Sequence, residues 1–160
     1  MAEERDLAAV AEIYNEVLRT STAIYRDEET TLEERIQWWE SQRQRGYPLL
    51  IAEEDDGHVL GFASYGDFRP WPGYRFTVEG SIHLRPTARR HGTGTMLLHD
   101  LIAHARTAGK HMLIAGVDAE NLPSRRFIEK IGAEQTAHLK EVGFKFGHYL
   151  DLVLYQIRLS

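Results

Sequence analysis

The first third of the chain carries hydrophobic residues at the spacing of amphipathic helices. A first helix is predicted to begin at a capping Asp6. Its apolar positions, which lie mostly three or four residues apart, are Leu7, Val10, Ile13, Tyr14, Val17 and Leu18. Thr31 and Glu34 then have the spacing of a capping box, which predicts a second helix carrying Ile36 and Trp39. Two helices therefore open the chain.

Apolar runs bounded by turn residues follow these helices, a pattern typical of β-strands. Residues 49–52 and 59–65 flank an Asp-Gly pair at 56–57, so they predict a hairpin. Residues 66–74 contain two prolines and predict a loop. Residues 76–84 resume as a third strand, which a proline then ends.

The second half alternates helices and strands. Residues 95–108 predict a helix with Gly109 as its C-cap, and residues 111–117 form an apolar strand. A short helix over 124–131 and a final strand over 150–159 complete the order ααβββαβαβ. This order predicts an α/β (α+β) fold with a mixed sheet and helices on both faces.

Composition limits the class of protein. With 160 residues and 42 % hydrophobic content, the chain can bury one core, so we expect a single domain over residues 1–160. The absence of cysteine excludes disulfides, thiolate metal sites and a cysteine nucleophile. A net charge of −5 argues against general nucleic-acid binding. No apolar run reaches the roughly 20 residues of a membrane span, and residues 1–5 do not resemble a signal peptide, so we expect a cytoplasmic protein without membrane contact.

A basic glycine turn is the strongest chemical signal. Residues 89–94, Arg-Arg-His-Gly-Thr-Gly, stand between a predicted strand and a predicted helix. Such a turn can point backbone N–H groups and a helix N-terminus at a phosphate, and the arginines add charge-assisted donors. A dinucleotide fingerprint is disfavoured because Leu97 stands where a third glycine is needed, and the residues after Gly92 do not fit a Walker loop. A plain helix-entry turn flanked by solvated arginines remains an alternative.

Several separated motifs resemble the GNAT (Gcn5-related) N-acetyltransferases. Arg89, Gly92 and Gly94 match the acyl-CoA signature Q/R-x-x-G-x-G/A of that family. Further segments resemble the branch of phosphinothricin and methionine sulfone/sulfoximine acetyltransferases, in the same order along nearly the whole chain. They are residues 64–70, 79–84, Asn121 with Ser124, 129–132 and 143–147.

The resemblance implies a GNAT fold with a mostly antiparallel sheet whose strands splay at an acetyl-CoA site. Pantetheine would pair with the backbone of the strand that ends at Leu84, and pyrophosphate would lie on the amides of the glycine turn. The residues expected to bind acetyl-CoA are Ile82, His83, Leu84, Arg89, Arg90, His91, Gly92, Thr93, Gly94, Thr95, Asn121, Ser124 and Lys130. Asn121 could equally be only a helix cap, and Lys130 only a solvated charge.

The implied reaction is acetyl transfer to a primary amine, which must lose a proton before it attacks a thioester. Glu79 stands where the resembled branch has its glutamate, so we expect it to be the catalytic base. A solvated glutamate, or one paired with Arg75, is the alternative. Transfer is expected to be direct, because no cysteine could carry an acetyl group. No metal is expected, since His99 and His104 lie five residues apart and so on different helix faces.

An amino-acid-like substrate is expected beside Glu79. Arginines near this strand could hold a carboxylate or phosphinate-like group, although solvated loop arginines are an equal alternative. An aromatic residue could form a wall of the site, or simply belong to the core. The residues expected to bind the substrate are Tyr25, Arg69, Gly73, Tyr74 and Arg75.

Two departures from the resembled family keep alternatives open. Ile128 stands where many members have a tyrosine and this branch often has a histidine, so the proton donor to the thiolate is unassigned among water, His148 and Tyr149. The usual first strand is also missing from the pattern. The alternatives are a GNAT enzyme acting on peptide N-termini or other amines, or a non-catalytic acyl-CoA-binding module. The resemblance further implies a homodimer.

Overall fold

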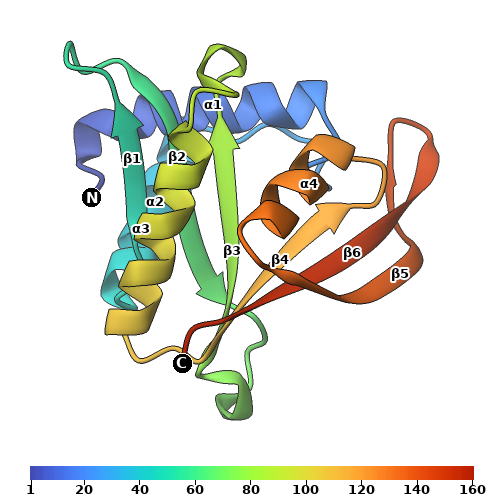
Figure 1. The fold of residues 1–160 in the computed structure, drawn as a ribbon. Coiled ribbons are helices and arrows are strands. Elements are labelled where there is room, and N and C mark those ends of the chain that lie inside the picture. The colour runs from blue at the N-terminus through green and yellow to red at the C-terminus, as the bar shows by residue number, and fades with distance from the viewer.

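The computed structural model describes residues 1–160 and combines four α-helices with one six-stranded sheet (Figure 1). The α-helices are α1 (Leu7–Thr20), α2 (Leu32–Gln44), α3 (Thr93–Thr107) and α4 (Leu122–Lys130). The strands are β1 (Leu49–Glu53), β2 (Val59–Asp67), β3 (Thr77–Leu84), β4 (Met112–Asp118), β5 (Glu134–Lys145) and β6 (His148–Arg158). Three 3₁₀ turns, Glu4–Asp6, Pro72–Tyr74 and Pro86–Ala88, complete the elements.

The strands are ordered β1-β2-β3-β4-β6-β5, and every neighbouring pair is antiparallel except β3 and β4. The helices cover both faces: α3 and α4 lie in front of the sheet in Figure 1, with α1 and α2 behind it. The mixed, mostly antiparallel sheet with helices on both faces was predicted, and the structure confirms it.

Two hydrophobic clusters attach the helices to the sheet. On the face of α3 and α4, buried Leu98 and Leu101 pack with Val78 and Leu113 from the central strands. On the other face, α1 and α2 pack against β1 and β2; Leu7, Val10, Ile13, Trp39, Leu49, Val59 and Phe62 form this cluster. The central strands are therefore apolar on both faces where helices cover them.

One strand escaped prediction. β5 was not predicted, because most of its twelve residues are exposed and their sequence shows no apolar alternation. It pairs with β6, whose start at His148 lies two residues before the predicted Leu150. Pairing with a long neighbour, rather than burial, makes this segment a strand.

The helix-start predictions had mixed outcomes. Asp6 does not cap α1 with its side chain; its carboxylate instead accepts the backbone N–H of Glu3 at 2.8 Å, because a short 3₁₀ turn precedes the helix. The capping box of α2 is confirmed: Thr31 Oγ1 accepts from Glu34 N, and Glu34 accepts from Thr31 N, both at 3.1 Å. No strand precedes α1, although Ala2 N donates to Leu49 O at the start of β1.

Candidate active site

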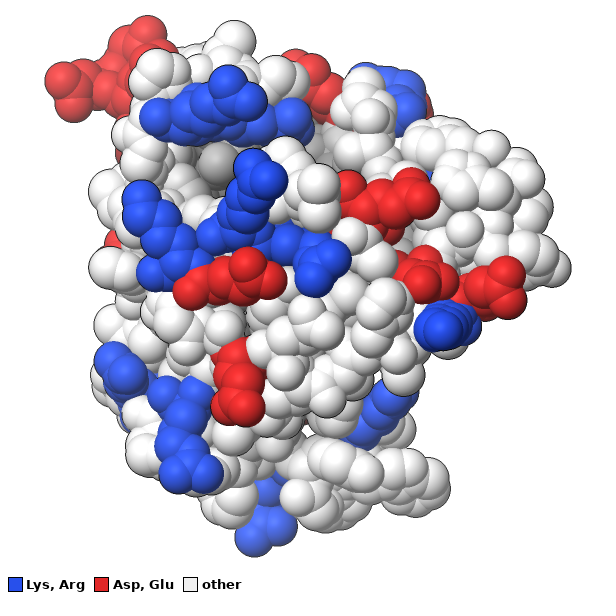
Figure 2. Space-filling model, turned by 45° about the vertical axis from the view of Figure 1, so that its right-hand side comes forward, with Lys and Arg blue, Asp and Glu red and all other residues white.

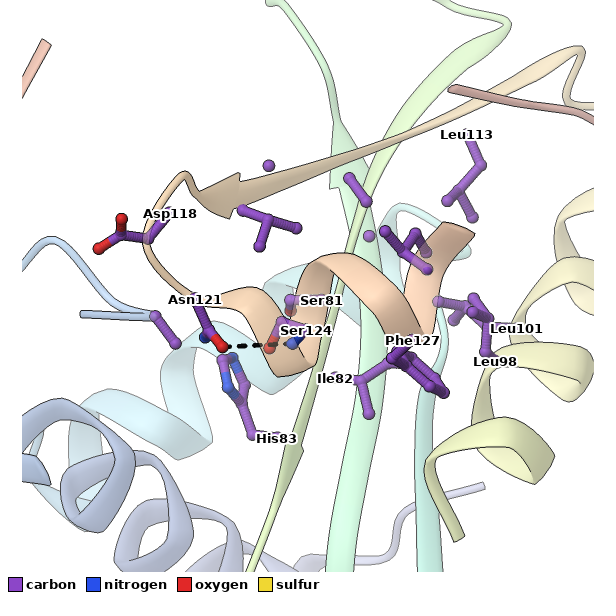
Figure 3. A pocket seen from close by; sticks show the side chains of 16 residues that line it. Ser81, Ile82, His83, Leu98, Leu101, Leu113, Asp118, Asn121, Ser124 and Phe127 are labelled. Atoms are coloured by element: carbon purple, nitrogen blue, oxygen red, sulfur yellow. Dashed lines mark hydrogen bonds between the residues drawn. The ribbon is translucent and has the colours of Figure 1, made fainter. Parts of the chain in front are cut away.

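The parallel strands β3 and β4 separate soon after they meet. They pair only at Thr77 with Met112, Val78 with Leu113 and Glu79 with Ile114. Beyond this point the gap between them opens into a cavity of about 130 Å³. Figure 3 shows its lining: Ser81 and Ile82 come from β3 and Leu113 from β4, with side chains of α3 and α4 closing the other sides. The splayed strands expected from the resemblance are therefore present.

A larger groove of about 800 Å³ continues from this cavity to the surface. The two spaces share six residues: Ala23, Ile82, His83, Asn121, Ser124 and Phe127. Arg89 and Arg90 line the groove, and Figure 2 shows basic side chains gathered around a hollow on this side of the molecule. A long ligand with an anionic end could therefore lie in the groove and send an uncharged arm between the strands.

The glycine turn forms the start of α3. Gly92 is the N-cap residue with φ of 86°, a left-handed conformation that glycine adopts without strain, and Arg90 is also left-handed with φ of 67°. Met96 N donates to Gly92 O at 3.0 Å, whereas the N–H groups of residues 93–95 have no backbone acceptor. These N–H groups and the positive end of the helix dipole thus lie at the end of the groove that Arg89, Arg90, Gly94 and Thr95 line.

Most residues expected to bind acetyl-CoA lie on these walls. Ten line the groove or the cavity: Ile82, His83, Leu84, Arg89, Arg90, Gly92, Gly94, Thr95, Asn121 and Ser124. The side chains of His91, Thr93 and Lys130 do not: Thr93 is buried, Lys130 is the exposed last residue of α4, and His91 is exposed on the turn.

Two of these residues have clear structural roles as well. Asn121 caps α4, because its Oδ1 accepts from Ser124 N at 3.2 Å, a bond drawn in Figure 3. The His83 ring is buried against Tyr14 and Phe62, and burial lowers its pKa to about 4, with the Arg35 charge contributing in the same direction. His83 is therefore neutral near pH 7 and offers polar atoms without charge.

Glu79 stands where the two strands part. Its Oε1 lies 3.4 Å from the point that a Cβ on Gly116 of β4 would occupy, so the absence of a side chain there leaves room for the carboxylate. The residue keeps solvent access, yet burial raises its pKa above the ordinary value, with the Arg69 charge acting in the opposite direction. The carboxylate is not paired with Arg75, because that guanidinium donates to Pro72 O at 3.1 Å and covers the Phe76 ring.

The residues expected to bind the substrate lie in two separate places. Arg69 stacks on Phe68, whose ring meets Tyr74 edge-on, in the loop that follows β2. Tyr25 instead rests on β5 and β6, where its hydroxyl donates to Asp151 O at 3.3 Å, and burial raises its pKa to about 12. Tyr25, Arg69, Gly73, Tyr74 and Arg75 all lie outside the walls of the cavity and of the groove, and only Arg69 influences Glu79.

Several lining residues gave no signal in the sequence. Phe127 lines the cavity from α4, Ala23 lies where it meets the groove, and Asp118 lines it at the end of β4. Ile128, which the sequence places where many members have a tyrosine, also lines the cavity. Asp118 accepts Glu120 N at 2.9 Å and could have been noticed as a carboxylate at the end of a buried strand. His148 and Tyr149, which were considered as proton donors, are exposed at the β5–β6 hairpin and line neither space.

Two further properties complete the description. No group of three histidine, cysteine or acidic residues could hold a metal ion. None of the helices combines the length and the apolar character that crossing a membrane requires.

A sheet opened between two parallel strands, a basic glycine turn at a helix start and a carboxylate at the opening define a class of acyl-CoA-binding α/β transferases. The chain belongs to the acetyltransferase (GNAT) family, whose model matches residues 9–133. The predicted family, the predicted GNAT fold and the predicted enzyme class, an acetyl-CoA-dependent N-acetyltransferase, are thereby confirmed.

Individual relatives match almost the whole of this chain. An L-methionine sulfoximine/L-methionine sulfone acetyltransferase of Salmonella typhimurium is 40 % identical over 99 % of this chain and 92 % of its own length. A phosphinothricin N-acetyltransferase of Alcaligenes faecalis is 38 % identical over 97 % of this chain and 79 % of its own. A solved structure from Salmonella typhimurium with its cofactor acetyl-CoA has a TM-score of 0.96 and 40 % identity, covering 99 % of this chain and 91 % of that one.

Proposed function

We propose that this acetyl-CoA-dependent enzyme acetylates the amino group of a small amino acid with a polar tetrahedral tail, of the methionine sulfoximine, methionine sulfone or phosphinothricin type. The names of the two relatives described above support this substrate class. The observation that carries the catalytic part is Glu79, a carboxylate of raised pKa at the point where β3 and β4 part.

The groove and cavity fit acetyl-CoA. Free N–H groups of residues 93–95, with Arg89 and Arg90, suit the pyrophosphate. Gly94 lines the groove without a side chain, and a Cβ there would lie 3.3 Å from the Leu84 side chain. The backbone of Ile82 and Leu84 lies beyond the last β3–β4 pair, so it can pair with the pantetheine amides. Acetyl-CoA supplies the activated acetyl thioester.

Glu79 acts as the base in this proposal. A substrate ammonium has a pKa well above neutrality, so a nearby acceptor must take its proton, directly or through water. A raised pKa makes the carboxylate a stronger base than an ordinary glutamate, while Gly116 gives it room to move. Arg69, which already lowers the pKa of Glu79 by its charge, lies where it can hold the carboxylate of an amino acid.

We also propose that residues 1–160 act as one domain and that two copies form a homodimer without nucleic acid or membrane partners, in the cytoplasm. β5 is an edge strand, and the hairpin that it forms with β6 exposes large apolar side chains. These are Leu139, Val142, Phe144, Phe146 and Tyr149. Sedimentation or light scattering of the purified chain tests the dimer.

The substrate experiment measures CoA release from acetyl-CoA with a panel of amines: methionine sulfone, methionine sulfoximine, L-phosphinothricin, ordinary amino acids and short peptides. Turnover confined to the first three compounds, and lost in Glu79→Gln, supports the proposal. Preferred turnover of peptides favours an enzyme for peptide N-termini. Acetyl-CoA binding with no turnover on any amine favours a non-catalytic binding module.

A further inference from the structure

A buried lysine outside the described site ties two distant parts of the chain together. Lys145 is the last residue of β5 and is only 2 % exposed. Its ammonium donates to three backbone carbonyls, Leu18 O at 2.6 Å, Ile24 O at 2.7 Å and Ser21 O at 2.9 Å. An ammonium has three N–H donors, so every one of them is used on a single stretch of seven residues.

This stretch covers the end of α1 and the start of the segment that leads to α2. Residues 21–31 contain no helix or strand. Ser21 is also tied to α1, because its N–H and its hydroxyl donate to Val17 O at 3.0 and 2.9 Å, and the Ile24 side chain packs with Val17 and Leu18. Ala23 N donates to Ser21 Oγ at 3.2 Å, and Tyr25 OH donates to Asp151 O at 3.3 Å. Lys145 Nζ is nevertheless the only group that donates to the Ser21 and Ile24 carbonyls. Leu18 belongs to the last turn of α1, whose carbonyls lack helical partners and carry the negative end of the helix dipole, so a cation is favoured there.

The same stretch is a wall of the ligand groove. Thr20, Ser21, Thr22 and Ala23 all line the groove, and Ala23 also lines the cavity between β3 and β4. Phe146, which follows Lys145 and lies 4.8 Å from its ammonium, lines the groove too. The groove is therefore bordered by a segment that Lys145 holds in place and by Phe146 of the hairpin that carries Lys145.

The hairpin that carries Lys145 closes directly after this residue. Lys145 pairs with His148 across the two-residue turn of Phe146 and Gly147, whose φ values of 50° and 81° are those of a type I′ turn. Gly143 admits the Tyr25 ring, since a Cβ there would lie 2.4 Å from that ring. Lys145 thus extends from a strand end that is paired with β6 to a segment that has no regular structure beyond the end of α1.

We propose that Lys145 is a positioning residue for the acetyl-CoA groove, holding residues 18–24 in the conformation that binds the cofactor. Lys145 lines neither the groove nor the cavity, so it acts through the backbone of this segment. The proposal concerns acetyl-CoA binding, so it is independent of which amine the enzyme acetylates.

The test compares Lys145→Met with the wild type in two measurements made without any amine. Calorimetry should show acetyl-CoA binding weakened by about tenfold, the order of cost expected when part of a binding wall must be ordered as the ligand binds. Hydrogen exchange should accelerate at residues 20–25 while α3 and β2 keep their protection. Lys140→Met, an exposed lysine on the same strand, is the matched control and should change neither measurement.

Because the chain has no cysteine, the ammonium can be restored at this position alone. Lys145→Cys is alkylated in urea with 2-bromoethylamine and refolded beside wild-type protein treated in the same way; the restored ammonium should recover binding. Unchanged affinity and exchange in Lys145→Met would overturn the proposal, as would faster exchange spread evenly over the whole chain. If that variant does not fold, Lys145→Gln, which keeps an amide donor, is measured with the same criteria.

Discussion

Replacing Glu79 by glutamine tests the proposed base most directly. The substitution keeps the shape of the side chain but removes its ability to accept a proton. General base catalysis contributes about 10²- to 10⁴-fold to rate, or about 3 to 5 kcal/mol of transition-state stabilisation. We expect kcat to fall by this amount in a CoA-release assay, while the dissociation constant for acetyl-CoA stays within twofold, because Glu79 does not line the groove.

The pH dependence sharpens this test. The base must be ionised, so kcat/KM should fall as the pH decreases through the pKa of Glu79. Because burial raises this pKa, the acidic limb of the pH–rate profile should lie above the range of an ordinary carboxylate. Arg69 lowers that pKa, so Arg69→Gln should move the limb to higher pH. Arg75→Gln is the control: its guanidinium is held by Pro72 O and should leave the limb in place.

The melting temperature of Glu79→Gln shows whether the variant loses activity without losing its fold. A carboxylate whose pKa is raised by folding prefers to be protonated in the folded state, so its ionisation costs stability as the pH rises through that pKa. Glu79→Gln removes this cost and should melt at the same temperature as the wild type, or slightly higher, at pH 7.5. Full activity of Glu79→Gln with an unchanged acid limb would refute the assignment, and another group would have to take the proton.

The remaining predictions concern the cofactor walls and one buried histidine. Gly92→Ala places a side chain at φ of 86°, so it should cost about 1 kcal/mol in denaturant unfolding and weaken acetyl-CoA binding in calorimetry. Asn121→Ala removes the α4 cap and should cost about 1 kcal/mol, whereas Asn121→Ser keeps a cap; a raised KM for acetyl-CoA in both variants would show that the amide also binds ligand. Folding lowers the pKa of His83 from about 6.5 to about 4, so the folded state resists protonation of this ring. The wild type should therefore lose up to about 3 kcal/mol of unfolding free energy as the pH falls from about 6.5 to about 4. His83→Asn should lose less over the same range in denaturant unfolding.

The fold could be predicted where burial leaves a pattern. Strands β1 to β4 and helices α1 and α3 bury one side or both, so their apolar patterns predicted them to within a few residues. Helix α2 has little apolar spacing and was predicted from its capping box instead. β5 could not be predicted, because hydrogen bonds to β6 define it and most of its side chains are exposed. The hydrogen bonds of Lys145 could not be predicted either, because its acceptors, such as Leu18 O, lie more than a hundred residues away in the sequence.

The site divides in the same way. Backbone-determined parts, such as the glycine turn and the strand that carries Glu79, were predicted from motifs and lie where expected around the groove and the splay. Side-chain directions were less predictable: Arg75 turns to Pro72, and Tyr25 rests on the β5–β6 hairpin instead of lining the cavity. Such orientations depend on neighbours that come together only in the folded chain.

The short β3–β4 pairing has a mechanical consequence. Only three residue pairs join the half-sheet β1-β2-β3 to the half-sheet β4-β6-β5, so this seam is the weakest line across the sheet. A ligand that hydrogen-bonds to the open part of this seam links the two halves of the sheet. Its binding raises the free energy of unfolding by RT ln(1 + [L]/Kd). At a hundred times its dissociation constant, acetyl-CoA would add about 2.7 kcal/mol. The cofactor thus also holds the two halves of the sheet together, and the melting temperature of the enzyme should rise with the concentration of acetyl-CoA.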